Sequence, residues 1–173
     1  MAEPLLWDDV AYMFDPSDGG TLPDVVVEGT TAADWQLLLD LVRERGWAHE
    51  YDDGDTVRPL PAAVTVLARP DDADCPSLVV RPTADVCAIF RFYAAETIDF
   101  DVSLLEIQGQ DRLDVLCAFL TAIGRRLGKP VVMYAEGGYP DCPMIGYDPE
   151  AERVVLLRAG RIAARRPSDS IRA

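Results

Sequence analysis

The spacing of hydrophobic residues predicts two helices. The first spans residues 31–45, after Thr31 and Asp34, which resemble a capping box, and stops at Gly46. The second spans residues 110–127 and stops at Gly128. In both helices, apolar residues recur every three or four positions, as they do on one buried helix face: Trp35, Leu38, Leu39, Val42, Leu113, Leu116, Leu120, Ile123 and Leu127.

Shorter apolar segments between turn residues predict strands. They cover residues 25–27, 47–51, 56–58, 77–81, 86–93, 97–102, 131–135, 144–147 and 154–157, with a short helix after Pro61 over residues 62–68. The three strands between residues 77 and 102 should form an antiparallel meander. In the last of them, Ile98, Phe100 and Val102 alternate with polar residues that include Asp99 and Asp101. This alternation is typical of a sheet with one face buried and the other in water.

Together these elements predict a single α+β domain. Its sheet should be mixed but mostly antiparallel, with the two main helices packed on one face. We expect residues 1–23 to pack on the domain through Trp7 or Phe14, residues 24–159 to form the domain, and residues 160–173 to be a flexible Arg-rich tail.

Charge is distributed unevenly along the chain. Residues 1–120 carry 24 acidic residues and 7 arginines, whereas residues 121–173 carry 6 acidic and 9 basic residues. The formal net charge of -14 exceeds the magnitude of about 2 to 8 that suffices for solubility in a small domain. The excess favours a basic partner, or it reflects a host whose proteins are acidic in general. Fifteen arginines against the single Lys129 fit a GC-rich bacterial genome.

Several classes of protein are disfavoured by the sequence. It shows no secretion signal and no apolar run of the roughly 18 to 20 residues that a membrane helix needs, so we expect a soluble cytoplasmic protein that binds no membrane. Its cysteines form no CxxC pair and should be free thiols: Cys75, Cys87, Cys117 and Cys142. No cofactor is predicted.

Three common catalytic or ligand-binding patterns are incomplete. His49 is the only histidine, and no nucleophile motif accompanies it. Gly137-Gly138 follows a strand but lacks the lysine and the following helix of a phosphate loop. The arginines after residue 157 have no aromatic platform, and the acidic body would repel phosphate, so nucleic-acid binding is not expected.

Asp99 and Asp101 are the strongest candidates for chemistry. Residues at i and i+2 of a strand project from one face, so these two carboxylates could share a divalent cation. Together with Glu106 and Glu136 they could form a metal-dependent hydrolase site, and we expect Glu96 to lie close to it. The alternation of the strand equally predicts a solvated or partner-facing surface.

An acidic surface with aromatic residues among its charges predicts a protein-binding site. Charge steers the encounter, and buried rings hold the complex. The predicted partner-binding residues are Asp52, Asp53, Asp55, Asp99, Asp101, Tyr134, Glu136 and Tyr139. An ordinary acidic surface, kept only for solubility, would show the same pattern.

A resemblance supports the binding interpretation. Residues 119–131 read FLTAIGRRLGKPV and are preceded by Ile98-Asp99-Phe100-Asp101. Over about residues 85–136 the chain resembles small acidic α/β proteins of bacteria, some of which are immunity proteins that neutralise a toxin. The resemblance implies a non-enzymatic inhibitor of a cationic toxin and carries no defined inhibitory residue.

Three functional hypotheses follow from the sequence. The leading one is an acidic protein-binding module, of the immunity type, with a basic protein partner. The second is the metal-dependent hydrolase at Asp99, Asp101, Glu106 and Glu136. The third is a small structural or regulatory homodimer that pairs through an open sheet edge.

Overall fold

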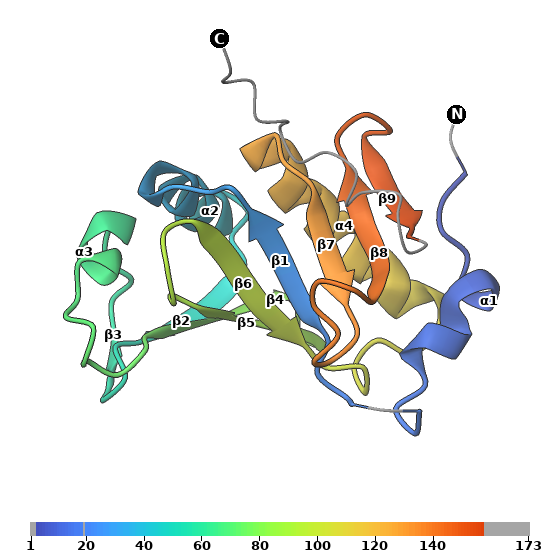
Figure 1. The fold of residues 1–173 in the computed structure, drawn as a ribbon, viewed down its shortest axis with the longest axis horizontal. Coiled ribbons are helices and arrows are strands. Elements are labelled where there is room, and N and C mark those ends of the chain that lie inside the picture. The colour runs from blue at the N-terminus through green and yellow to red at the C-terminus, as the bar shows by residue number, and fades with distance from the viewer. Residues whose placement is uncertain (1–2, 19, 158–173) are drawn as a thin grey trace, which may run out of the picture.

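Nine antiparallel strands, drawn as arrows in Figure 1, form one continuous sheet. The computed structural model describes residues 3–18 and 20–157. Across the sheet the strands lie in the order β3-β2-β4-β5-β6-β1-β7-β8-β9. The strands are β1 (Asp24–Glu28), β2 (Ala48–Asp52), β3 (Val57–Arg58), β4 (Ser77–Thr83), β5 (Val86–Arg91), β6 (Thr97–Val102), β7 (Val131–Tyr134), β8 (Pro143–Asp148) and β9 (Arg153–Leu156).

Two long helices, α2 (Ala32–Glu44) and α4 (Gln110–Leu127), pack on one face of this sheet (Figure 1). They contact each other, and α4 also contacts strands near both ends of the sheet. The short helix α3 (Ala63–Leu67) packs against α2. Two helical turns, α1 (Trp7–Val10) and η1 (Ala11–Phe14), precede β1. The predicted α+β fold, with both main helices on one face, is confirmed.

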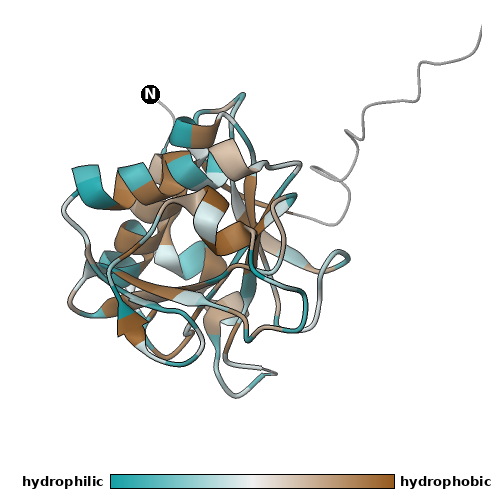
Figure 2. Ribbon diagram, turned by 90° about the vertical axis from the view of Figure 1, so that its left-hand side faces the viewer, coloured by the Kyte–Doolittle hydropathy of each residue, from teal (hydrophilic) through white to brown (hydrophobic). Residues whose placement is uncertain are grey.

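Alternation along the strands separates the core from the other face of the sheet. Phe100 of β6 is buried, and its ring centroid lies 5.7 Å from that of Phe119 of α4 and 4.4 Å from that of Phe90 of β5. Asp99 and Asp101 lie on the opposite, open face and are half-buried. Hydrophilic and hydrophobic residues alternate along helices and strands in Figure 2.

Local sequence signals set the ends of the two main helices. The amide of Asp34 donates to Thr31 Oγ1 at 3.3 Å, and Asp34 Oδ2 accepts from the Thr31 amide at 3.0 Å, which is the predicted capping box. Helix α4 ends at Gly128, whose φ of 64° is a left-handed conformation that suits glycine.

The position of β1 was not predicted. This first strand lies in the interior of the sheet, between β6 and β7, and pairs antiparallel with both. The parallel pairings expected of a mixed sheet are absent among the described strands. The predicted meander of β4, β5 and β6 is present.

The segment before β1 packs on the sheet–helix body. Val10 and Phe14 are fully buried in the core, and the Trp7 amide donates to Gln110 Oε1 of α4 at 2.7 Å. The helical turns of this segment had no clear sequence signal. The predicted tail, residues 160–173, lies outside the described residues. None of the helices within the described part of the chain combines the length and the apolar character needed to cross a bilayer.

Candidate functional site

The pairing of β1 with β6 creates a cluster of three carboxylates on the open face. Asp24 lies opposite Asp101, and Val26 lies opposite Asp99. Opposite residues of an antiparallel pair share a face, so Asp24 joins the two aspartates of β6. One carboxylate oxygen from each of the three lies within 4.8 Å of the others. We call Asp24, Asp99 and Asp101 the acidic cluster.

Burial and mutual repulsion raise the pKa values within the acidic cluster. The pKa of Asp99 rises to about 6, mainly because the carboxyl is partly withdrawn from water, and further because of the charges of Asp24 and Asp101. Burial also raises the pKa of Asp101, against the opposing effect of Arg91. Asp99 therefore takes up a proton at a mildly acidic pH, where an ordinary aspartate stays ionised.

Arg91 of β5 is the cation that contacts the acidic cluster among the described residues. Its Nη2 lies 2.9 Å from Asp101 Oδ2, and the Asp101 side chain is only 16% exposed. In the sheet register Arg91 lies directly opposite Asp99. A single guanidinium thus faces three carboxyl groups, which can accept a further cation.

Two tyrosines lie beside the acidic cluster. Tyr134 of β7 lies opposite Asp24 in the register. Tyr139, in the loop between β7 and β8, packs edge-on against the Tyr134 ring, with 5.0 Å between the ring centroids. The Tyr139 hydroxyl donates to Glu28 of β1, and this hydrogen bond is the main cause that raises the Tyr139 pKa to about 12. Tyr139 remains 45% exposed. Tyr134 therefore adjoins Asp24 of the acidic cluster, and Tyr139 packs on Tyr134.

The acidic turn at residues 52–55 lies apart from the acidic cluster. Asp52 belongs to the same cross-strand row as Arg91 and Asp99, but it is three strands away from Asp99, or roughly 14 Å at the usual strand spacing. Backbone amides of Thr56 and Asp55 and the Arg58 guanidinium lower the pKa of Asp53 to about 2. The Asp53 carboxylate therefore holds its own turn together.

The remaining predicted carboxylates point elsewhere. Glu106 accepts a hydrogen bond from the Cys87 amide at 2.8 Å, and Glu136 accepts one from the Leu22 amide at 3.0 Å. The carbonyl of Glu96 accepts from the Thr30 amide at 3.0 Å, and its side chain is not part of the cluster. The structure thus groups Asp24 with Asp99 and Asp101, in place of the expected Glu106 and Glu136.

The cluster can serve two kinds of ligand. Three carboxylate oxygens at this separation can surround a lysine or arginine head group through charge-assisted hydrogen bonds. The same oxygens could provide ligands for a hard divalent cation such as Mg²⁺ or Ca²⁺. Asp24 belongs to the acidic surface that the sequence indicates, but neither Asp24 nor Arg91 is among the predicted site residues, because their roles depend on which strands are neighbours. The three valines after Asp24 were the available signal that this strand lies in the interior of the sheet, since interior strands are apolar on both faces.

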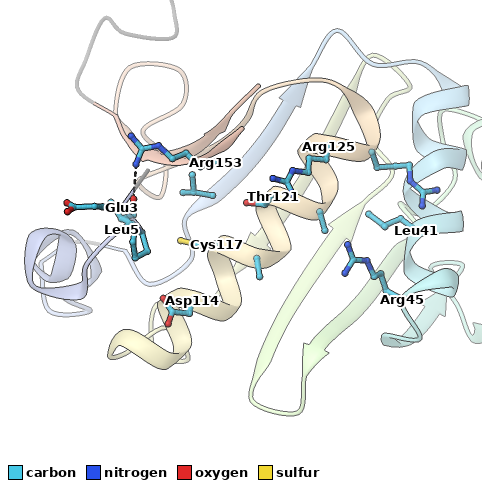
Figure 3. A pocket seen from close by; sticks show the side chains of 14 residues that line it. Glu3, Leu5, Leu41, Arg45, Asp114, Cys117, Thr121, Arg125 and Arg153 are labelled. Carbon is cyan, nitrogen blue, oxygen red and sulfur yellow. Dashed lines mark hydrogen bonds between the residues drawn. The ribbon is translucent and has the colours of Figure 1, made fainter. Parts of the chain in front are cut away.

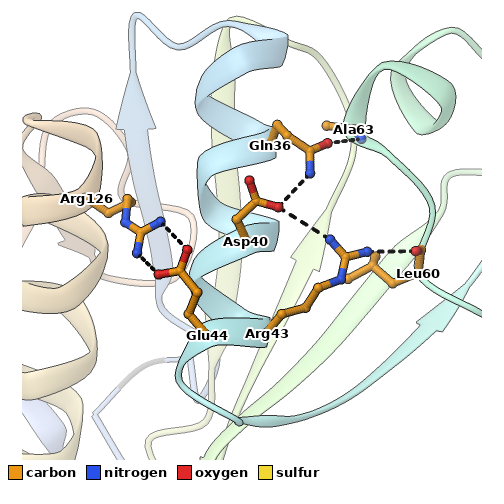
Figure 4. A network of polar contacts seen from close by, with 7 residues as sticks. All are labelled: Gln36, Asp40, Arg43, Glu44, Leu60, Ala63 and Arg126. Atoms are coloured by element: carbon orange, nitrogen blue, oxygen red, sulfur yellow. Dashed lines mark hydrogen bonds and ion pairs between the residues drawn. The ribbon is translucent and has the colours of Figure 1, made fainter.

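A second feature lies on the helical face, where a hollow of about 730 Å³ follows the outer side of α4 (Figure 3). Four arginines line it: Arg45, Arg125, Arg126 and Arg153. Arg126 forms an ion pair with Glu44 of α2, next to a polar network in which Asp40 accepts from Gln36 Nε2 at 2.9 Å and pairs with Arg43 (Figure 4). The Arg126–Glu44 pair connects α2 to α4, and the Ala63 amide donates to Gln36 Oε1 at 2.8 Å, which connects α2 to α3.

No family model matches this chain, and neither a curated protein nor a solved structure is significantly similar to it.

Proposed function

We propose that the protein is a non-enzymatic binding module that holds a basic protein partner on the open face of its sheet. The observation that carries this proposal is the acidic cluster, in which three carboxyl groups meet one arginine. Burial, and after it the charges of Asp24 and Asp101, raise the pKa of Asp99, and a lysine or arginine of the partner, inserted beside Arg91, would relieve the repulsion between these carboxylates. The partner would be a toxin, and the module its immunity-type inhibitor.

The net charge supports a steered encounter with such a partner. A charge of -14 attracts a basic surface over about a Debye length, which is close to 10 Å at 0.1 M salt. The turn at Asp52, Asp53 and Asp55 lies at the end of the sheet beyond β4 and extends the acidic field away from the cluster. Charges at such a rim mainly increase the association rate.

The two tyrosines supply contact area beside the charges. The Tyr134 and Tyr139 rings are in edge-to-face contact, and Tyr139 is restrained by its hydrogen bond to Glu28. Ordered aromatic side chains lose little conformational freedom on binding and are frequent among residues that dominate binding energy. The proposed contact surface is therefore the acidic cluster together with Tyr134, Tyr139 and Glu28.

The test is capture of a partner with charge-matched variants. Tagged wild-type protein, the Asp99→Asn/Asp101→Asn double variant and a control Asp71→Asn/Asp72→Asn double variant would be exposed to lysate from the source organism. Asp71 and Asp72 are exposed in the loop before β4, so the control removes the same charge elsewhere. Washes at low and at roughly 0.5 M salt distinguish partners held only by long-range charge attraction, which salt screens, from partners held by direct contacts.

The expected result is a basic protein retained in stoichiometric amount by wild type and control, and lost from the cluster variant. The purified pair should associate more slowly as salt increases, and the partner's own toxic activity should be inhibited. Equal retention by all three forms would contradict the proposal, because the cluster would then contribute nothing beyond net charge.

A divalent-cation site is the second candidate, and the separation of the three carboxylate oxygens, within 4.8 Å, favours it. Titration calorimetry with Mg²⁺, Mn²⁺ and Ca²⁺ tests this candidate. Saturable binding that is lost in Asp24→Asn would support it and would direct work toward metal-dependent hydrolysis. Absence of a binding heat at millimolar metal would contradict the cation site and leave the basic partner as the ligand of the acidic cluster.

A further inference from the structure

The hollow along α4 has a floor of small and apolar side chains. Ala118 and Ala122 lie one helical turn apart on α4, with Leu41 of α2 on one side and Leu5 and Val154 on the other. Short side chains let another backbone approach the helix closely. The volume of about 730 Å³ falls in the range of sites that enclose a ligand or a short peptide segment.

Cys117 contributes to this floor as an apolar group. Burial raises the pKa of its thiol to about 12, so the thiol stays protonated at neutral pH. A protonated, largely buried cysteine packs like a small hydrophobic residue. The floor is therefore uncharged along the middle of α4.

The rim of the hollow is basic. Arg45 comes from the end of α2, Arg125 from α4 and Arg153 from β9, and Figure 3 shows Arg45 and Arg153 on opposite sides of α4. The Arg45 guanidinium has no hydrogen-bond or ion-pair partner among the described residues. Arg125 donates to the Glu152 carbonyl at 3.3 Å, and Arg153 donates to the Glu3 carbonyl at 2.8 Å. Main-chain carbonyls carry no net charge, so these two hydrogen bonds do not neutralise the positive charges of Arg125 and Arg153.

Acidic residues offset only part of this charge. Glu44 pairs with Arg126, and Asp114 at one end of the hollow accepts a hydrogen bond from Gln110 at 2.7 Å. Glu3 also lines the hollow. Arg45, Arg125 and Arg153 remain without a carboxylate partner within the described part of the chain. On a protein with 30 acidic and 16 basic residues, a basic rim is a marked local departure.

We infer that this hollow is a second binding site, which receives an acidic peptide segment of a protein partner. An acidic segment can place carboxylates against arginines on both sides of α4 while its small apolar side chains cover Ala118 and Ala122. The site lies on the helical face, whereas the acidic cluster lies on the open face. Two partners of opposite charge can therefore occupy the protein together.

The arrangement disfavours other occupants. A second copy docked by two-fold symmetry would place this arginine rim against itself. A nucleic acid is a long polyanion and would extend beyond the rim onto an acidic body. A single phosphate would meet only part of a rim whose arginines come from α2, α4 and β9. A short acidic segment matches both the extent of the rim and its charge.

Fluorescence anisotropy with a labelled peptide of repeated Asp-Glu-Ala-Leu units tests the inference. Its counterpart with lysines in place of the acidic residues serves as the charge control. The protein forms are wild type, Arg45→Gln/Arg125→Gln, Ala118→Trp and the control variant Arg81→Gln. Arg81 is exposed on β4, away from the hollow, and Ala118→Trp fills the floor without changing charge. Circular dichroism and thermal melting establish that each variant is folded.

We expect saturable binding of the acidic peptide to wild type and to Arg81→Gln. Any binding of the lysine peptide, which the acidic cluster on the other face can accept, should not change in Arg45→Gln/Arg125→Gln or in Ala118→Trp. The Arg45→Gln/Arg125→Gln form should bind the acidic peptide at least about tenfold more weakly, the factor lost with one charge-assisted hydrogen bond, and Ala118→Trp should also lose affinity. Absence of saturable binding, or equal binding by all forms, would overturn the inference. So would displacement of the peptide by equimolar inorganic phosphate, or sedimentation showing self-association that depends on Arg45 and Arg125.

Discussion

Asp24 of β1 lies directly opposite Asp101 of β6, and Val26 two residues further along lies opposite Asp99. This register places three carboxyl groups on one open surface, where burial and then the charges of Asp24 and Asp101 raise the pKa of Asp99 to about 6. Sheet pairing, which stabilises the fold, here brings like charges together. That conflict is typical of a surface kept for binding, because the free energy lost in the unbound protein can be recovered when a cation arrives.

The contribution of Asp99 to the free energy of unfolding should fall as pH rises from about 4 to about 6. Asp99 has a higher pKa in the folded chain than in the unfolded chain, so the folded state holds its proton more tightly across that interval. Asp99→Asn removes the cost of ionisation. Allowing for solvent screening, it should raise the free energy of unfolding by about 1 to 2 kcal/mol near pH 8. The gain should vanish below about pH 4, where the aspartate is protonated in both states.

Urea denaturation at a series of pH values measures this effect. Asp71→Asn, on an exposed loop, controls for the loss of one negative charge from the whole molecule. An equal gain in both variants would assign the effect to net charge and contradict the local explanation.

Removing Arg91 should destabilise the protein at neutral pH. Arg91→Gln leaves the acidic cluster without the guanidinium that contacts Asp101 at 2.9 Å. We expect a loss of about 1 to 2 kcal/mol in the free energy of unfolding, since this ion pair is partly shielded from water. In an Asp101→Asn background the same substitution should cost much less. A double-mutant cycle measures the coupling, and strictly additive effects would argue against it.

Replacing Gly124 with alanine should destabilise the protein, against the usual trend within helices. The Tyr147 ring of β8 packs directly on Gly124 of α4, and a Cβ there would overlap it. Glycine to alanine in an open helix position gains about 1 kcal/mol. Here overpacking should cost about 1 to 3 kcal/mol. Thermal melting compares Gly124→Ala with Ala118→Gly, at an exposed position of α4, which should lose only the stability that corresponds to the difference in helix propensity. In a Tyr147→Val background the Gly124→Ala substitution should cost much less, and an unchanged cost would point away from the ring contact.

Thr31→Ala should weaken the start of α2. It removes the hydroxyl that accepts from the Asp34 amide and so breaks the capping box. The expected loss is about 1 kcal/mol in the free energy of unfolding. Thr31→Ser keeps the hydroxyl and should cost much less. Chemical denaturation distinguishes the two, and similar losses in both would exclude the cap as the cause.

Several elements could be predicted from the sequence because their causes are local. The capping box at Thr31, the glycine stop at Gly128 and the apolar periodicity of both helices all depend on residues within a few positions of each other. The alternation from Thr97 to Val102 likewise gave the face of Asp99 and Asp101, since successive strand residues point to opposite faces.

The tertiary structure decided which residues share a surface. It placed β1 between β6 and β7, which brought Asp24 to the acidic cluster, and it directed Glu106 and Glu136 to backbone amides elsewhere. It also gathered arginines from α2, α4 and β9 around one hollow. The sequence by itself determined the two main helices, most of the strands, their buried faces and the net charge. Neighbouring strands and converging side chains depend on contacts between distant segments, which local periodicity does not encode.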